Sequence, residues 1–486
     1  MDIHQLLAGE DTGALIAELK SGRKSGEPKT EVYAAQLNPS LHDVNDPGKR
    51  PDKRVRTDLP ERPGQTVRVT SGGEDEPDGN TRTEKVARIA LALQKLIVKR
   101  AVAFTFGNPV RLNAEPKGDD EKTVLKAVKR ILFDTKGRTL NRRVAREIFS
   151  TTEAAEFWYP VVNAHESYGF HSGYKLRAAV FGPSNGDKLY PYFDETGDMA
   201  AFSREFTRTD RSGVSHLYFE TYTDRDIRLW INRNGRWETA EGYPVRNVTG
   251  KIPIVYGCQP AVEWEDVQSL IDRLEKLLSN FADTNDYHAS PKIVVKGEVT
   301  GFSKKGETGA ILQLEGDNPD ARYLSWEHAP ESVKLEIDTL LRMIYTVTQT
   351  PDISFDSVKG LGALSGVALK LLFMDAHLKV QEKMEIFDDF LQRRLSIIQA
   401  YVGQFDTKLQ NACRRLTVEP EITPYMIEDE QAAVSLLMDA NGNRPVASQR
   451  LTVQRLGWAE DAEMECRQIA EETELHAYRD AFNPTM

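Results

Sequence analysis

Apolar positions between residues 83 and 150 recur at steps of three and four, which predicts three helices. The first is expected to begin at Thr83, a residue suited to an N-cap, and to end at the turn that starts with Gly107. The other two are expected over residues 119–133 and 139–150. Each helix has one apolar face, so each is expected to pack on a core.

Residues 155–256 change to a strand pattern of short aromatic or β-branched runs separated by Gly, Asn and Pro. Their order predicts an antiparallel sheet of hairpins. Helical spacing returns over residues 263–287 and 330–348, with three short strand-like runs between them at 289–328. We therefore expect a helical hairpin with a small β unit at its tip.

A stretch without proline from residue 365 to 405 predicts a very long helix. Its apolar residues lie on more than one face, which is typical of a helix that packs against several neighbours. A Gly-rich loop at 350–365 precedes it. A strand and turn at 415–427 and one or two polar helices at 441–486 are expected after it.

The beginning of the chain has a different composition. A short helix is expected within residues 1–20, but residues 21–80 are rich in Pro, Gly and charge. Such a segment buries little and predicts an extended, partly disordered arm. Its basic part is interpreted as a solvated surface, with a nucleic-acid contact as the less favoured alternative. The basic residues are Lys49, Arg50, Lys53, Arg54 and Arg56.

Composition narrows the functional classes. Apolar residues make up 40% and charged residues 28% of the chain, as in ordinary globular proteins. No apolar run is long enough for a membrane span or a secretion signal. The three cysteines are far apart, which fits a reducing compartment such as a bacterial cytoplasm. A net charge of −11 argues against tight, static DNA binding but allows a channel through which DNA slides.

Motifs for catalysis or cofactor binding are not found in the sequence. The Gly-rich segment 360–366 lacks the Lys-Ser/Thr of a phosphate loop, and Ser365 is not in a nucleophile elbow. The pair Asp388-Asp389 and the acidic cluster at Glu263 are interpreted as solvated or helix-capping charges. No catalytic residue, metal ion or cofactor is therefore expected.

Several motifs in fixed order resemble the portal proteins of siphophages. "FTFGNPVRL" resembles a turn of that family after an early helix, and "GKIPIVYG" before "LLSNFADTND" resembles the entry into its first stem helix. "PKIVVKGEV" resembles its first clip strand. The most specific segment is residues 344–373, where a helix, a T-x-x-P-D loop, a Gly-rich stretch and a long helix follow one another. The resemblance covers residues 84–475.

The resemblance implies an α+β portal fold with a β-rich wing, two long stem helices, a small α/β clip inserted between them and a helical crown. The implied parts are an arm at 1–82, the wing at 83–262, the first stem helix at 263–288, the clip at 289–329, the second stem helix at 330–349, the tunnel loop at 350–365, the long helix with wing return at 366–440 and the crown at 441–486.

The resemblance also implies a structural function and no enzymatic one. The chain would form a ring, dodecameric in the virion, at one capsid vertex, as the channel for packaging and ejection of double-stranded DNA. Implied partners are the terminase large subunit, head-completion or adaptor proteins, and the major capsid and scaffolding proteins, with no membrane. Assembly would take place in the host cytoplasm. A phage-encoded metal-dependent nuclease and another head-tail connector component remain as alternatives.

Two groups of residues are implied to lie near DNA. The tunnel loop would project into the channel, where phosphate contacts must be weak for DNA to slide. Its named residues are Asp352, Ser354, Asp356, Lys359, Gly360, Gly362, Ser365 and Gly366. On the stem, Arg273, Lys276 and Arg342 would line the channel or form surface and inter-subunit salt bridges.

Overall fold

The computed structural model divides the chain into two compact units. Unit 1 comprises residues 1–350 and 376–424, and unit 2 comprises residues 351–375 and 425–486. The structure describes residues 3–9, 11–23, 26–56, 81–288, 293–301, 313–323, 329–352, 371, 373–425, 430–442, 445–459 and 461–482. No described helix is long and apolar enough to cross a membrane.

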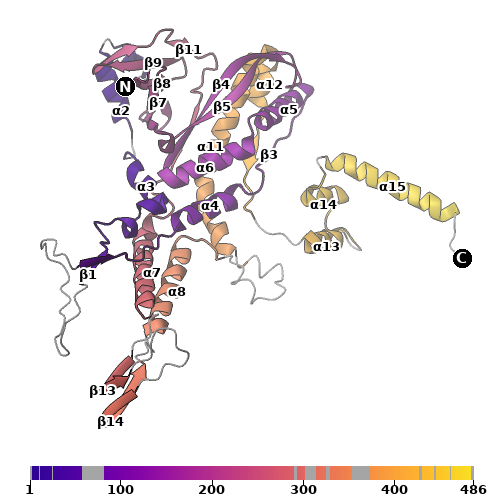
Figure 1. Cartoon of the computed structure of the whole chain (residues 1–486). Helices are drawn as coiled ribbons and strands as arrows, with labels where there is room; N and C mark the ends of the chain where they lie inside the picture. The colour runs from indigo at the N-terminus through magenta and orange to yellow at the C-terminus, as the bar shows by residue number, and fades with distance from the viewer. Residues whose placement is uncertain are drawn as a thin grey trace. The chain divides into compact units, whose positions relative to one another are not determined.

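Two antiparallel sheets form the β-rich part of unit 1 (Figure 1). One has the strand order β12-β4-β5, and the other has the order β10-β9-β8-β7-β6 with β11 paired to β9. Their bounds are β4 Glu153–His165, β5 Ser172–Phe181, β6 Lys188–Phe193, β7 Met199–Thr209, β8 Ser215–Tyr222, β9 Asp226–Arg233, β10 Arg236–Thr239, β11 Val245–Arg246 and β12 Ile254–Cys258. The antiparallel hairpins predicted over residues 155–256 are confirmed.

Helices pack against the three-stranded sheet in one large core. They are α4 Leu93–Phe106, α5 Asp119–Asp134, α6 Gly137–Thr151, α11 Met374–Phe405 and α12 Gln410–Arg415, joined by the strand pair β3 Arg111–Asn113 and β15 Glu419–Glu421. Phe387 of α11 lies edge-on to Phe106 and Phe149, with ring centroids 4.9 and 5.9 Å apart. These contacts bury several faces of α11, as its apolar pattern predicted.

A buried ion pair fixes α11 to the sheet. Arg394 donates from Nε and Nη2 to the two carboxylate oxygens of Glu156 on β4, at 2.9 and 2.7 Å. The side chains are 4% and 0% exposed, and Asn141 of α6 accepts a further bond from the guanidinium. The bidentate geometry compensates for the cost of burying both charges.

Two antiparallel helices leave the core and carry a β hairpin (Figure 1). They are α7 Gln268–His288, preceded by the short 3-10 helix η4 Glu265–Val267, and α8 Ala329–Val347. Between them lie β13 Ile293–Gly301 and β14 Gln313–Tyr323. The predicted hairpin is confirmed, although the described residues of the second and third predicted strand runs both belong to the single strand β14.

The start of the first predicted helix is wrong. Residues Thr81–Glu84 form the strand β2, which pairs with β1 Lys53–Arg56, and residues 85–92 belong to no helix or strand. Helix α4 begins only at Leu93. The helical spacing is real, but alternate backbone amides of this segment donate to side chains of α7, which favours an extended backbone.

The N-terminal arm, residues 3–52, is folded against the rest of unit 1. It contains α1 Ile3–Leu6, α2 Thr12–Ser21, α3 Thr30–Leu37 and the 3-10 turns η1 Pro39–Leu41 and η2 Asp43–Asn45. Its apolar residues Leu15, Ile16 and Leu19 pack on the six-stranded sheet. The segment after residue 26 buries Tyr33 and His42, which is more than its composition predicted.

Unit 2 contains three described helices near the C-terminus. They are α13 Glu430–Asn441, α14 Gln449–Leu456 and α15 Ala462–Phe482. Ser448 caps α14 by accepting a hydrogen bond from the Leu451 amide at 3.2 Å. Helix α11 is described from Met374, so the predicted start of the long helix near residue 365 lies outside the described residues.

Candidate functional site: helix α7 and the segments packed on it

One face of α7 binds the backbone of the extended segment 85–92. We call these hydrogen bonds the amide ladder; they join Leu91 N to Glu275 Oε1 (2.7 Å), Ile89 N to Ser279 Oγ (2.9 Å) and Ala87 N to Asp283 Oδ1 (2.7 Å). Residues four positions apart on a helix are about 6 Å apart along its axis. Amides two positions apart on a strand are about 6.7 Å apart. The similar spacings let helix side chains satisfy an extended backbone.

The same face of α7 binds His42 of the arm. His42 Nδ1 lies 2.7 Å from Glu275 Oε1, and Nε2 lies 2.7 Å from the Gln36 carbonyl oxygen. The His42 and Glu275 side chains are 4% and 1% exposed. Trp264, just before η4, donates from Nε1 to the Gln36 side-chain oxygen at 2.9 Å. The arm is therefore attached to both the start and the middle of this helix.

The hydrogen bonds of His42 set its charge. Burial alone lowers the pKa of His42, but the bonds to Glu275 and to the Gln36 carbonyl, with the nearby Asp272, raise it above its usual value. A carboxylate and a carbonyl oxygen can both accept, so this arrangement favours the protonated imidazole, in which both ring nitrogens donate. The contact is a charge-assisted pair inside the protein.

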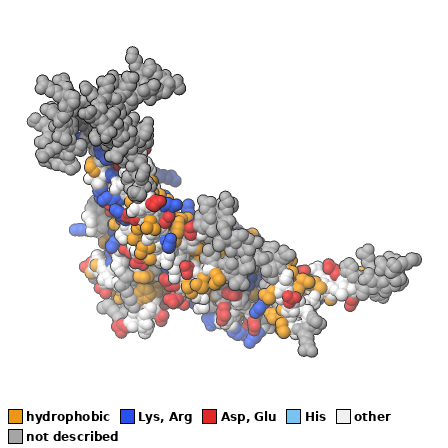
Figure 2. Space-filling view, turned by 90° about the horizontal axis from the view of Figure 1, so that it is seen from below, with side chains coloured by type: hydrophobic (Ala, Val, Ile, Leu, Met, Phe, Trp, Pro, Cys, Tyr) orange, Lys and Arg blue, Asp and Glu red, His pale blue; other side chains and the backbone are white. Residues whose placement is uncertain are grey.

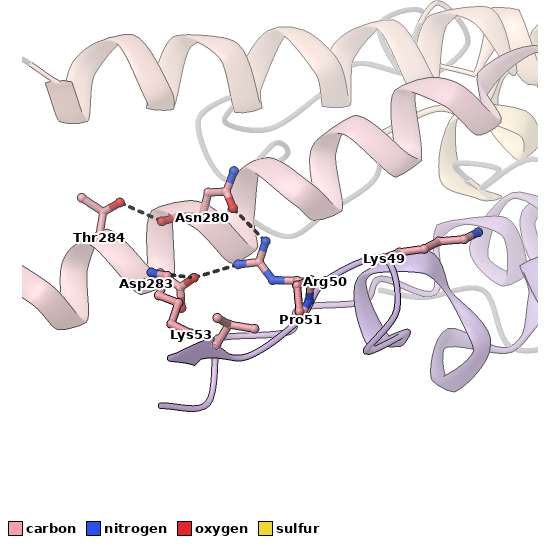
Figure 3. A pocket seen from close by; sticks show the side chains of 8 residues that line it. Lys49, Arg50, Pro51, Lys53, Asn280, Asp283 and Thr284 are labelled. Carbon is pink, nitrogen blue, oxygen red and sulfur yellow. Dashed lines mark hydrogen bonds and ion pairs between the residues drawn. The ribbon is translucent and has the colours of Figure 1, made fainter. Parts of the chain in front are cut away.

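A pocket of about 510 Å³ lies where the arm meets α7 (Figure 3). Arg50 forms its floor, donating to Asn280 Oδ1 and Asp283 Oδ2, both at 2.8 Å. Lys53 Nζ lies 3.6 Å from the same Asp283 oxygen. Lys49 also lines the pocket, and its ammonium lies 2.6 Å from Asp43, which is not a lining residue. Cations of the arm thus surround one carboxylate of the helix.

The three predicted stem cations differ in whether they form an ion pair. Arg273 donates to Glu336 of α8 at 2.7 and 2.9 Å and is half exposed, so it links the two helices. Lys276 and Arg342 are exposed. Neither has an ion-pair partner among the described residues. Arg273 therefore forms a surface salt bridge, whereas Lys276 and Arg342 are accessible to solvent.

A buried ion cluster joins the two ends of the Gly-rich loop. Glu263 lies 2.5 Å from Lys379 Nζ and 2.9 Å from Lys383 Nζ, and its side chain is 3% exposed. Lys379 also donates to the Thr348 carbonyl at 2.9 Å. Burial raises the pKa of Glu263, but the two ammonium groups outweigh it and hold the pKa below its usual range. Lys379 of α11 thus joins Glu263 and Thr348, which both precede the loop, to the helix that follows it.

A model of a known protein family matches most of the chain. The model, described as phage portal protein, SPP1 Gp6-like, matches residues 73–477 of the 486. The chain belongs to this portal protein family. The family is structural and not enzymatic, so the alternative of a nuclease is set aside. The resemblance inferred from the sequence is confirmed.

Solved neck structures of gene transfer agent (GTA) particles are similar to the portal protein. The neck of an empty GTA particle, with C6 symmetry, matches with a TM-score of 0.43 and 10% identity over 75% of this chain and 90% of that chain. The neck of a native GTA particle, with C12 symmetry, gives 0.40 and 10% over 75% and 88%. No curated protein sequence matches the chain.

The implied tunnel loop of the portal protein is described only at its edge. Asp352 is exposed at the start of the loop. The other implied loop residues, Ser354, Asp356, Lys359, Gly360, Gly362, Ser365 and Gly366, lie outside the described residues. In the described ranges, no group of three or more His, Cys, Asp or Glu side chains is placed to hold a metal ion.

Sequence reasoning missed His42 and the structural role of Glu263. Glu263 was interpreted as a solvated or capping charge, but it is the centre of a buried cluster. Its partners Lys379 and Lys383 are more than a hundred residues away. Their four-residue spacing on one face of a helix was the available signal.

Proposed function

We propose that this portal protein forms a closed ring, dodecameric in the virion, around a channel for double-stranded DNA. Membership of the family supports the proposal. Identical subunits with a head-to-tail interface close into a ring when the rotation between them divides a full turn. Such a subunit needs surfaces that a single copy leaves uncovered.

The observation that carries the proposal is the second apolar face of α8. Leu340 and Ile344 are buried, at 9% and 0% exposure. Leu335, Met343 and Val347 of the same helix are 68%, 49% and 52% exposed. Apolar side chains also reach the surface among charged ones on the face in Figure 2. An exposed apolar stripe on a long helix favours packing against a second copy.

The proposed assignment of parts follows the chain. Helices α7 and α8 are the stem, the β13–β14 hairpin is the clip, and residues 350–365 are the tunnel loop. The Glu263 cluster supports this, because it joins α11, which follows the loop, to Thr348, which precedes it. Lys276 and Arg342 are accessible for weak phosphate contacts in the channel.

The proposed location is one vertex of the capsid. There the clip would dock the terminase large subunit during packaging and head-completion or adaptor proteins afterwards, while the wing would contact major capsid and scaffolding proteins. Packaging energy would come from the terminase, because the portal family is not enzymatic.

Deleting residues 354–362 tests the tunnel loop. We expect rings of unchanged mass and appearance by mass photometry and negative-stain microscopy, because the Glu263 cluster lies outside the deletion. Packaged DNA per particle should fall, because the loop would no longer contact DNA. Normal packaging by this variant would refute the loop assignment, whereas a stable monomer of the unmodified chain at high concentration would refute the ring.

A further inference from the structure

Strands β1 and β2 form a basic ribbon at the edge of α7. The pair is antiparallel, with Lys53 opposite Glu84 and Arg54 opposite Thr83. Residues 49–56 and 81–88 contain eight Lys and Arg residues and two acidic ones, Asp52 and Glu84, in a chain whose net charge is −11. The ribbon is therefore a concentrated positive region on an acidic protein.

Two arginines form ion pairs that hold the base of the ribbon in place. Arg88 Nη2 donates to Asp52 Oδ1 at 2.8 Å and to the Arg50 carbonyl at 3.0 Å. Arg50 is bound to Asp283 and is only 14% exposed. These contacts hold the ribbon on α7 and pair Asp52 and Asp283 with arginines at its base.

The remaining cations point to solvent. Lys49 and Lys53 are 58% and 60% exposed, and Arg54 and Lys85 are exposed as well. Lys53 borders the pocket in Figure 3, at the junction with α7. Exposed ion pairs such as Lys49 with Asp43 are weak, so a phosphate can replace the carboxylate at little cost.

The surface suits a polyanion better than a protein partner. Among the described side chains of residues 49–54 and 83–85, the exposed ones are charged or polar apart from Pro51. Protein interfaces need an apolar, desolvated centre, which this surface lacks. Contacts to a DNA backbone need only Lys and Arg at accessible positions. We propose that the ribbon binds the phosphate backbone of double-stranded DNA without sequence preference.

The ribbon lies away from the contact between α7 and α8. The amide ladder and Arg50 occupy one side of α7, while α8 packs along the other (Figure 1). The ribbon is thus on the side of α7 away from α8. The proposal goes beyond the proposed channel, because a portal ring would then hold DNA that is not threaded through it.

A closed circular duplex is the probe that separates the two contacts, because it cannot be threaded through a ring. Binding to the assembled full-length ring is measured by gel shift and fluorescence anisotropy over a series of salt concentrations. For the double variant Lys53→Gln/Arg54→Gln, we expect weaker binding and a log K against log salt slope that is shallower by about 2, since each phosphate contact contributes about 0.9.

The matched control is Lys126→Gln/Lys129→Gln, which removes the same charge from exposed positions on α5. It should bind circular DNA as the unmodified ring does, and so should the variant lacking residues 354–362. Equal affinity and slope for the ribbon variant and the control would overturn the proposal. Loss of rings in the ribbon variant would overturn it as well, by showing that the ribbon is an interface between copies.

Discussion

Individual buried charges in this portal protein join segments that are far apart in sequence. Glu263 binds two lysines of α11, and one of these lysines binds the carbonyl at the end of α8. Arg394 similarly joins α11 to the sheet through Glu156. Each of these two buried ion pairs holds α11 in one position, because separating the pair would leave a buried charge without a partner and destabilise the fold.

Replacing Glu263 by Gln should destabilise the protein strongly. The substitution leaves two ammonium groups buried without their carboxylate, which costs about 3–5 kcal/mol. The expected result is a lower midpoint in chemical unfolding. Glu382→Gln is the control, because Glu382 also pairs with Lys383, at 3.3 Å, but is 66% exposed. The control should change the free energy of unfolding by less than about 1 kcal/mol. Similar effects of both substitutions would contradict the structural role of Glu263.

At the scale of elements, the arm is held by cations that meet carboxylates of the body. The pairs are Lys20 with Glu205 (2.5 Å), Arg23 with Glu153 (2.8 Å), His42 with Glu275 (2.7 Å) and Arg50 with Asp283 (2.8 Å). They extend from the six-stranded sheet to α7. The arm therefore connects the two sheets to α7 within one chain, and one of its four cations is titratable near neutral pH.

The His42 contact should make the arm sensitive to pH. Its pKa is raised in the folded protein, so its stabilisation is complete below the unfolded value of about 6.5 and is lost as pH rises through the folded value. At about pH 6, His42→Gln should reduce stability by about 1.5–3 kcal/mol, the range for a hydrogen bond to a charged group. At about pH 9 the difference should be smaller.

Thermal unfolding of both proteins across this pH range measures the effect. His171→Gln is the control, because His171 is 75% exposed and 3.9 Å from Glu166. A difference between wild type and His42→Gln that does not change with pH would show that His42 contributes only by packing.

The observed boundaries of the helices show where the local apolar pattern predicts secondary structure correctly and where it does not. Helices α5, α6, α7 and α8 have one apolar face each and were predicted to within a few residues. Residues 85–92 have the same spacing but are extended, because their amides bind side chains of α7. A partner almost two hundred residues away cannot be inferred from local periodicity. The ordered motifs predicted the family, but not the fold of the arm.

At the scale of the whole molecule, one subunit leaves part of its proposed stem uncovered. The exposed stripe of α8 would be buried only in an assembly. Stability of the subunit and assembly of the ring therefore depend on different faces of the same helix. Substitutions on the exposed face should affect assembly alone.

Leu335→Asp/Met343→Asp should prevent ring formation. Two carboxylates in an apolar interface lose their hydration without gaining a partner, so association becomes unfavourable. We expect a folded monomer by mass photometry, with a circular dichroism spectrum like that of the wild type. Val214→Asp, at a position 51% exposed between β7 and β8, should leave rings intact. Rings formed normally by the α8 variant would exclude this stripe from the interface.

The amide ladder also determines which changes in chain length the portal protein tolerates. Its acceptors recur every four residues of a helix and its donors every second residue of an extended segment. Inserting one residue among the donors would turn the next amide away from α7 and move the neighbouring side chains to the opposite face. Inserting two would restore the alternation. Among homologous chains, this segment should therefore vary in length by even numbers.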